Sequence, residues 1–361
     1  MASHEPSAVC VREAQLKAFC TAVLMRLGVP SDEAALVSEV LVEADLRGVE
    51  SHGVIRLPSY VERLSAGGTN SKPNIQAVRE TRTTAVLDGG NGLGHLVGVR
   101  AMELAMAKAT EGDCAFVAVR NSNHYGTAAY YAEMAARRDM IGLSFTISGM
   151  LLMPPWGGVE AMLGNNPLAI AFPTDREFPI VLDMACTVAR GKILIAAKKG
   201  AKIPPDWATG PDGLPTTDPA EALKGFLLPV GGPKGYALAL VVGLLCTMLS
   251  DASFGTEIGQ LHKQTDIPQN VGHLFGVLPI SAFEDIGHYK QRIGKAIQDL
   301  QSVKKAPGVE QIYLPGEREY LLLQERRRQG IPISRGVFQD LQEIGGRYGI
   351  TLAESRDLGT H

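Results

Sequence analysis

A short segment of the sequence concentrates side chains that bind anions and move protons. Within residues 50–60 it holds a hydroxyl, an imidazole, a guanidinium and a phenol, at Ser51, His52, Arg56 and Tyr60. An imidazole exchanges protons near neutral pH, and a guanidinium holds a carboxylate through two hydrogen bonds. Taken singly, each residue is more simply a capping or solvated side chain. Taken together, they predict a site that binds an organic acid and transfers a proton.

The helix that carries this segment is expected to begin late. Proline is tolerated in the first turn of a helix, because its missing N–H has no partner to lose there. Pro58 therefore predicts a helix that starts near Val54 or Ile55 and runs to about Leu64. His52 would lie on the entry turn, with Arg56 and Tyr60 one turn apart on a single helix face.

The composition narrows the class of protein. The chain has 361 residues, 45% hydrophobic and 20% charged, with a net charge of -3. These values are typical of a globular protein with two or three domains, and they argue against nucleic acid or an anionic membrane as a partner. The longest apolar run, residues 236–249, is too short to cross a bilayer and is expected to be a buried helix. No signal peptide is expected, so the cytoplasm is the expected location.

The spacing of cysteines and histidines argues against a disulfide-rich protein and against a metal-binding protein. Five cysteines form an odd set without CxxC, so neither a disulfide framework nor a zinc site is expected. The eight histidines are scattered, and neither His52 nor His124 has a partner at metal-ligand spacing. We therefore expect no metal.

Alternating strand and helix patterns predict an α/β fold. The first helices are expected between residues 11 and 48, with Ser31 as an N-cap. A strand at 84–88 leads through a glycine-rich loop, 89–94, into a helix. Because no G-x-G-x-x-G fits this loop, it is expected to be a plain turn. Later elements are helices at 289–302, 320–329 and 336–348, and strands at 273–280 and 309–317. The arginine run 326–328 is expected to be a solvated face.

Two polar residues follow predicted buried strands. His124 follows the strand at 114–119, at the carboxyl end where α/β folds place their chemistry. Asp183 closes the apolar strand 179–183, and a buried carboxylate needs a partner. It either caps the next helix or orients an imidazole, and its residue type favours the cap. The glycine-rich turn at 229–236, with Lys234, opens a helix and has the features of a phosphate site or of a plain turn.

The assembled motifs resemble the type 2 malate/L-lactate dehydrogenases. The resemblance extends over residues 16–333. It rests on the segments 45–56 (DLRGVESHGVIR), 67–70 (GGTN), 121–126 (NSNHYG), 164–167 (GNNP), 182–185 (LDMA), 213–219 (GLPTTDP) and 232–236 (GPKGY).

This resemblance implies oxidoreduction of a small 2-hydroxy or 2-oxo acid with NAD or NADP. The alternative within the group is a ureidoglycolate dehydrogenase or a reductase of a cyclic imine-2-carboxylate. The implied cofactor fold is not a Rossmann fold. It has a large mixed sheet (76–283, with a small insertion near 190–250) and a helical domain from both chain ends (1–75 and 284–361). A homodimer with sites near the subunit interface is also implied.

Matching positions imply roles for individual residues. His52 is the acid/base, oriented by Ser51 and Asp183, and His124 is the alternative acid/base. Arg56 and Tyr60 bind the substrate. The implied cofactor contacts are His124, Ser148, Asp183, Met184, Ala185, Lys234, Gly235, Gly316 and Glu317. We therefore expect His52 to lie within hydrogen-bond reach of Asp183, directly or through Ser51.

One segment departs from the family pattern. Residues 148–156 contain Met and Leu where relatives often carry polar side chains. This change indicates either a more apolar substrate or a repacked loop.

Overall fold

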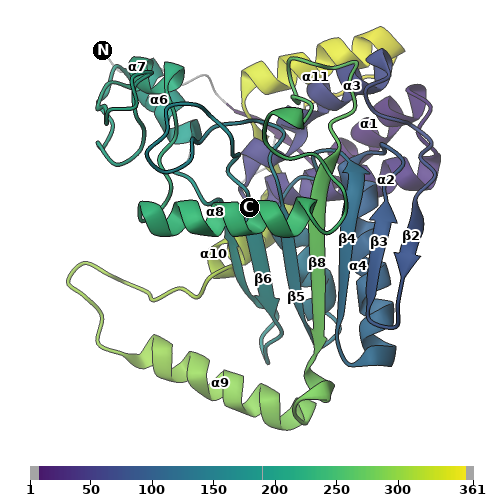
Figure 1. The fold of residues 1–361 in the computed structure, drawn as a ribbon, viewed down its shortest axis with the longest axis vertical. Coiled ribbons are helices and arrows are strands. Elements are labelled where there is room, and N and C mark those ends of the chain that lie inside the picture. The colour runs from purple at the N-terminus through teal and green to yellow at the C-terminus, as the bar shows by residue number, and fades with distance from the viewer. Residues whose placement is uncertain (1–7, 189, 355–361) are drawn as a thin grey trace.

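A seven-stranded mixed sheet forms the centre of the molecule (Figure 1). The structure, a computed structural model, describes residues 8–188 and 190–354. From edge to edge the strands are β2 (Gln76–Glu80), β3 (Thr84–Asp88), β4 (Ala115–Ser122), β8 (Val271–Pro279), β5 (Met140–Thr146), β6 (Leu168–Phe172) and β7 (Ile180–Met184). Only β3 and β4 pair in parallel among them. The predicted large mixed sheet is confirmed.

The strand β8 enters the sheet from far along the sequence. It pairs antiparallel with both β4 and β5, so it separates the two strands that α5 (Ala128–Ala136) connects. Because β4 and β5 both run against β8, they are parallel to each other. The residues that follow β4, including His124, therefore stand at the same sheet edge as those that follow β5.

Helices cover the two sheet faces unequally. The helix α4 (Gly94–Gly112) packs with α5 on one face, and α8 (Pro233–Thr247) crosses the other (Figure 1). The prediction that residues 236–249 form a buried helix is wrong in part. One side of α8 is packed, but Val241 and Met248 are 51% and 61% exposed. No helix in the described ranges is long and apolar enough to cross a membrane.

Both ends of the chain build a helical layer beside the sheet. One hydrophobic core joins β1, the first three α-helices, α10, β9 and α11. Their bounds are β1 (Val9–Val11), α1 (Glu13–Arg26), α2 (Ser31–Leu46), α3 (Leu57–Ala66), α10 (Glu317–Gln329), β9 (Ile331–Ile333) and α11 (Arg335–Tyr348). The pairing of β1 with β9 ties the two ends together.

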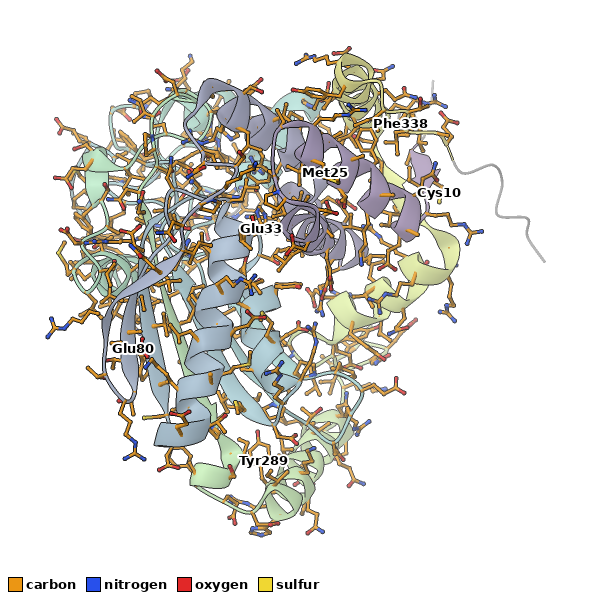
Figure 2. The ribbon with its side chains drawn as sticks, turned by 90° about the vertical axis from the view of Figure 1, so that its right-hand side faces the viewer. Cys10, Met25, Glu33, Glu80, Tyr289 and Phe338 are labelled. Atoms are coloured by element: carbon orange, nitrogen blue, oxygen red, sulfur yellow. The ribbon has the colours of Figure 1, made fainter. Side chains whose placement is uncertain are left out.

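The helix α9 (Ile286–Ser302) does not join this layer. Its Tyr289 donates a hydrogen bond to the Pro173 carbonyl, and Lys290 pairs with Asp139, so α9 packs against sheet-domain loops. Figure 2 shows Met25 and Phe338 at one end of the molecule and Tyr289 at the other. A domain boundary at residue 284 therefore does not follow the packing. The helices α6 (Arg190–Lys199) and α7 (Pro219–Lys224) contribute to a small separate core.

Three local predictions are wrong. Pro30, not Ser31, is the N-cap of α2, because the helix already includes Ser31. Residues 309–317 form no strand; the chain is irregular until Glu317 begins α10. Finally, α3 begins only at Leu57, and two 3-10 turns precede it, Glu50–His52 and Val54–Arg56.

Candidate active site

A buried carboxylate shapes the turns that carry His52. The Asp45 side chain is 2% exposed and accepts a hydrogen bond of 2.8 Å from the Val54 N–H. A Cβ at Gly53 would lie 2.0–2.3 Å from the Asp45 carboxyl atoms, so only glycine fits there. Burial raises the pKa of Asp45 to about 7. Asp45 and Gly53 therefore determine where one 3-10 turn ends and the next begins.

An arginine of α10 holds the same turns from outside. Arg326 donates to the Asp45 carbonyl and, at 2.7 Å, to the Glu50 carboxylate. Its side chain is only 12% exposed. The expectation that the whole arginine run is a solvated face is therefore wrong for Arg326. The sequence could not predict this role of Arg326, because its hydrogen-bond partners are more than 270 positions away in the chain.

The His52 imidazole lies between a hydroxyl and a second imidazole. Its Nδ1 is 2.9 Å from Ser51 Oγ, and its ring stacks on His124 with centroids 5.5 Å apart. Burial, followed by the nearby Arg56 charge, lowers the pKa of His52 to about 4. At neutral pH His52 is thus an uncharged imidazole that can accept a proton.

His124 is held more tightly than His52. Its Nδ1 is 2.7 Å from the Tyr60 hydroxyl, and its backbone N–H donates to the Gln269 side chain at 3.2 Å. Burial is the main cause that lowers its pKa well below the usual value. Behind Tyr60 lies His95, which is fully buried with ring centroids 5.1 Å apart. Tyr60 therefore contacts one acid/base candidate directly instead of standing apart from it.

Arg56 is fixed by two acceptors, one of which the sequence did not suggest. Its Nε donates to the Ser51 carbonyl at 2.6 Å, and its Nη1 is 3.2 Å from His262 Nε2. Within the described ranges no carboxylate pairs with Arg56. His262 lies 206 positions away in an irregular loop, where no periodic pattern could have marked it.

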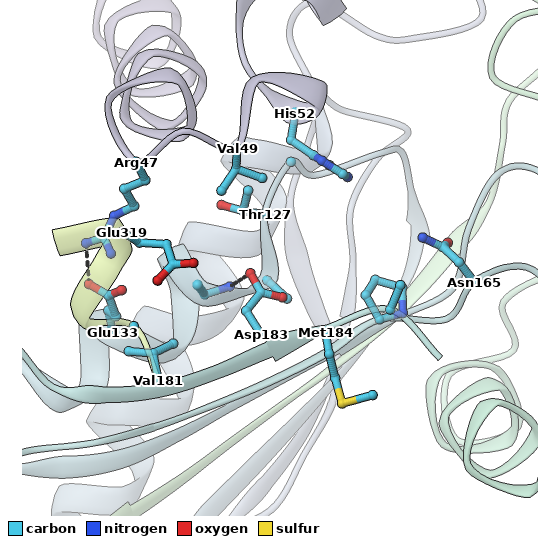
Figure 3. Close-up of a pocket in the computed structure, with 16 residues that line it drawn as sticks. Arg47, Val49, His52, Thr127, Glu133, Asn165, Val181, Asp183, Met184 and Glu319 are labelled. Atoms are coloured by element: carbon cyan, nitrogen blue, oxygen red, sulfur yellow. Dashed lines mark hydrogen bonds and ion pairs between the residues drawn. The ribbon is translucent and has the colours of Figure 1, made fainter. Parts of the chain in front are cut away.

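A cavity of about 230 Å³ opens beside His52 (Figure 3). It brings together several of the predicted residues, namely His52, Asp183, Met184, Ala185 and Gly316. Residues not predicted complete the wall, among them Arg47, Thr127, Asn165 and Glu319. Ser51, Arg56, Tyr60 and His124 lie behind or beside His52 and do not line this cavity. In the described part of the chain, no group of His, Cys, Asp or Glu side chains could hold a metal ion.

Asp183 does not orient His52 within one copy of the chain. Its carboxylate accepts a hydrogen bond of 3.0 Å from the Ala129 N–H, in the first turn of α5. Figure 3 shows that Asp183 and His52 project from different walls of the cavity. Burial raises the pKa of Asp183 to about 6. The expected contact with His52, directly or through Ser51, is wrong here, because the carboxylate caps a helix that precedes it in sequence.

Glu317 is also turned away from the cavity. Its carboxylate accepts hydrogen bonds from the Leu314 N–H and from the side chains of Gln301 and Gln311. The side chain is 7% exposed and supports the end of the irregular segment. Glu319, two residues further along α10, lines the cavity instead.

Comparison with known proteins places this geometry in a family. The family model for malate/L-lactate dehydrogenase matches residues 11–342. This chain belongs to the malate/L-lactate dehydrogenase family.

Individual relatives agree over nearly the whole chain. A malate dehydrogenase of Pyrococcus horikoshii is 43% identical, over 93% of this chain and 94% of the relative. The solved sulfolactate dehydrogenase of Methanocaldococcus jannaschii is 39% identical with a TM-score of 0.90, over 95% of this chain and 98% of that one. A ureidoglycolate dehydrogenase (NAD(+)) of Escherichia coli is 34% identical, over 88% and 90%. This member of the family is thus an oxidoreductase.

The turn before α8 in this dehydrogenase adjoins the cavity wall. The Val230 N–H donates to the Cys186 carbonyl at 2.9 Å, directly after Ala185. Gly232 has a φ of +65°, and a Cβ at Gly235 would lie 2.1 Å from the Val230 carbonyl, so both positions require glycine. Lys234 is exposed at the helix start. The turn is therefore tied to the segment that follows Ala185, but neither Lys234 nor Gly235 lines the cavity.

In segment 148–156, which differs from the family pattern, apolar residues pack against two of the cores. Ser148 Oγ accepts a hydrogen bond from the Met150 N–H at 3.1 Å and does not line the cavity. Met153 is 1% exposed, and its N–H donates to the Leu163 carbonyl. Leu152 packs against the small core of α6 and α7. The apolar residues thus fill cores, which favours a repacked loop over a more apolar substrate.

Proposed function

We propose that this dehydrogenase interconverts a small 2-hydroxy acid and its 2-oxo acid, of the malate/lactate type, with NAD or NADP. One observation carries the proposal: an uncharged imidazole, His52, opens onto a cavity, and Arg56, four positions further along the sequence, is a cation with no acidic partner among the described residues. The first group suits proton transfer from a hydroxyl, and the second suits a substrate carboxylate.

The cavity fits one end of a nicotinamide cofactor. Its volume of about 230 Å³ is below the roughly 300–1,000 Å³ of sites that enclose a whole ligand, so only part of a dinucleotide would enter. Met184, Ala185 and Gly316 would hold that part. Lys234 and Gly235 would hold a phosphate at the start of α8. When bound, the nicotinamide gives or takes the hydride.

The residues of this chain would handle the proton and the carboxylate. In the oxidation direction, Nε2 of the neutral His52 accepts the hydroxyl proton while Arg56 holds the carboxylate. The new charge on His52 is stabilised by the substrate anion, because an opposite charge nearby raises the pKa of an imidazole. In the reduction direction His52 returns this proton to the carbonyl oxygen. His124, tied to Tyr60, is the alternative acid/base.

Turnover assays would test the proposal. The purified protein should oxidise NADH or NADPH in the presence of oxaloacetate or pyruvate, as followed by nicotinamide absorbance. Ureidoglycolate with the oxidised cofactors and piperideine-2-carboxylate with the reduced ones test the alternative substrates. Faster turnover of either of these would move the assignment to that alternative. Absence of turnover with the whole panel would overturn the proposal.

We further propose that two copies of the chain associate through the open sheet face, and that the protein works in the cytoplasm. Apolar side chains remain exposed on this face, on α8 and on the strands beside it, at Val241, Met248, Phe116, Phe172 and Leu182. An apolar patch of this kind marks an interaction surface. All five cysteines are free thiols, which suits a reducing compartment.

A further inference from the structure

The loop at residues 259–269, between α8 and β8 in the chain, reaches the active site. It contains His262, which bonds Arg56, and Gln269, which accepts a hydrogen bond from the His124 N–H. Gln269 is fully buried, and its own amide donates to the Gly259 carbonyl at 3.1 Å. One loop therefore contacts both the proposed carboxylate-binding residue and an acid/base candidate.

A buried arginine fixes this loop against α3. Arg63 is 1% exposed and donates to the backbone carbonyls of Gln264 and Ile267, at 2.8 and 2.6 Å. It also donates to the Gly68 carbonyl at 2.9 Å. A Cβ at Gly68 would lie 2.1 Å from the Thr265 carbonyl, so the contact is close. The position of His262 is thus set by backbone contacts.

The hydrogen bonds of His262 define its tautomer. A guanidinium can only donate, so Nε2 of His262 must accept from Arg56 Nη1. The ring is therefore neutral, with its proton on Nδ1, which donates to Ser59 Oγ at 3.1 Å. Burial and the Arg56 charge lower the pKa of His262, in keeping with this neutral form. His262 is consequently a bridge between Ser59 of α3 and the Arg56 guanidinium.

We propose that His262 is a positioning residue that fixes the Arg56 guanidinium for the substrate carboxylate. The Ser51 carbonyl holds Nε and His262 holds Nη1, so the guanidinium cannot rotate and its remaining N–H groups stay available. A long side chain held by one bond alone would lose conformational freedom on binding substrate, which weakens affinity. This inference rests on the proposed role of Arg56 and adds a residue from a distant loop.

The test compares KM and kcat for the 2-oxo acid that the wild type reduces fastest. His262→Phe keeps a ring but removes both hydrogen bonds, and it should raise KM about tenfold with kcat within about twofold. His262→Gln retains an acceptor and a donor and should restore KM to within about threefold of wild type. His288→Phe, on the exposed surface of α9, is the matched control and should change neither constant.

Two further variants separate the possible failures. Arg56→Lys should raise KM. Adding His262→Phe to it should have little extra effect on KM, because both changes disrupt the same interaction between the guanidinium and the substrate carboxylate. If Arg56→Lys leaves KM unchanged, the proposed role of Arg56 and the inference both fall. If Arg56→Lys raises KM but His262→Phe does not, or lowers kcat in proportion, only the inference falls.

A substitution at Ser59 provides a second test in case the His262 variant does not fold. If His262→Phe does not yield folded protein, Ser59→Ala removes the Nδ1 partner and leaves both His262 and Arg56 in place. It should raise KM about twofold to threefold, with cofactor affinity unchanged by fluorescence titration. An unchanged KM in Ser59→Ala, with no folded His262→Phe, would overturn the role of His262.

Discussion

At the scale of single residues, the two stacked imidazoles differ in what holds them. The His124 ring is fixed at Nδ1 by a phenol and its backbone by a buried amide, whereas the His52 ring has a hydrogen bond, within the described ranges, only to the neighbouring Ser51 hydroxyl. His52 also lines the cavity. We therefore expect His52→Ala to lower kcat by about 10²- to 10⁴-fold while NADH still binds. Near-normal kcat in this variant, together with inactive His124→Asn, would transfer the acid/base role to His124.

The low pKa of His52 gives the oxidation reaction a defined pH dependence. The active form is the neutral base, and protonation removes it as the pH falls. With a pKa of about 4, kcat/KM for hydroxy-acid oxidation should stay level between pH 7 and pH 5 and decline only near pH 4. Initial rates after a rapid pH jump would measure this. Asp183→Asn, which does not touch His52, should have the same profile, and a half-loss near pH 6.5 in both proteins would contradict the prediction.

Asp45 couples the stability of the fold to pH. Its pKa is raised from 3.8 to about 7, so between these values the folded state binds a proton that the unfolded state has lost. The free energy of unfolding therefore falls as the pH rises from about 4 to 7, by on the order of 3 kcal/mol from this group. Asp45→Asn should lack this pH-dependent contribution to the free energy of unfolding. Urea unfolding should show the variant gaining stability relative to wild type between pH 5 and pH 8; a constant difference would argue against a buried, protonated Asp45.

At the scale of elements, the break between the two 3-10 turns depends on Gly53 having no side chain. Gly53→Ala would place a methyl group 2.0–2.3 Å from the Asp45 carboxyl atoms, so the turns must shift and His52 with them. We expect a loss of at least about 2 kcal/mol in unfolding free energy and most of the activity. Gly346→Ala in α11 is the control. It meets no atom within 4 Å and should stabilise by about 0.5–1 kcal/mol. Equal effects of the two variants in chemical unfolding would refute the steric argument.

The helix α10 acts on the same turns through one arginine. Arg326→Ala removes the bonds to the Asp45 carbonyl and Glu50, and it should lower kcat/KM about tenfold with a loss of about 1–3 kcal/mol in stability. Arg328→Ala, exposed on the same helix, should change the free energy of unfolding by less than about 0.5 kcal/mol. Steady-state kinetics and thermal unfolding of both variants would show whether Arg326 holds the 3-10 turns in place or is a solvated surface residue.

Local patterns predicted many elements but few of the long-range contacts. The strand at 84–88 has the expected bounds, because an apolar run between turn residues determines it locally. His262 and Arg326 reach the site across more than 200 positions, and loop or surface sequence carries no periodicity that marks such contacts. Asp183 was placed beside a helix correctly, but the helix it caps precedes it, because sheet order and not chain order sets its neighbours.

At the scale of the whole molecule, the helical layer and the sheet meet at the site. His52 and Arg56 come from the layer that both chain ends build, while Met184 and the turn before α8 come from the sheet domain. The cavity between them is too small for a whole dinucleotide. The open face of the sheet, with α8 across it, runs on from this cavity through β7 and Met184. A second copy on that face would lie close to the cavity, so association and activity should be linked.

The proposed dimer can be tested with a pair of methionines. Met248, just after α8, is 61% exposed on the open face, and Met25 of α1 is 47% exposed on the helical layer. A buried, unpaired carboxylate is costly, so Met248→Glu should convert the dimer to a monomer and reduce activity. Met25→Glu adds the same charge at a surface that stays in water and should do neither. Sedimentation velocity with parallel assays would measure both effects. A wild-type protein that sediments as a monomer, or a dimer unaffected by Met248→Glu and Val241→Glu, would exclude this face as the interface.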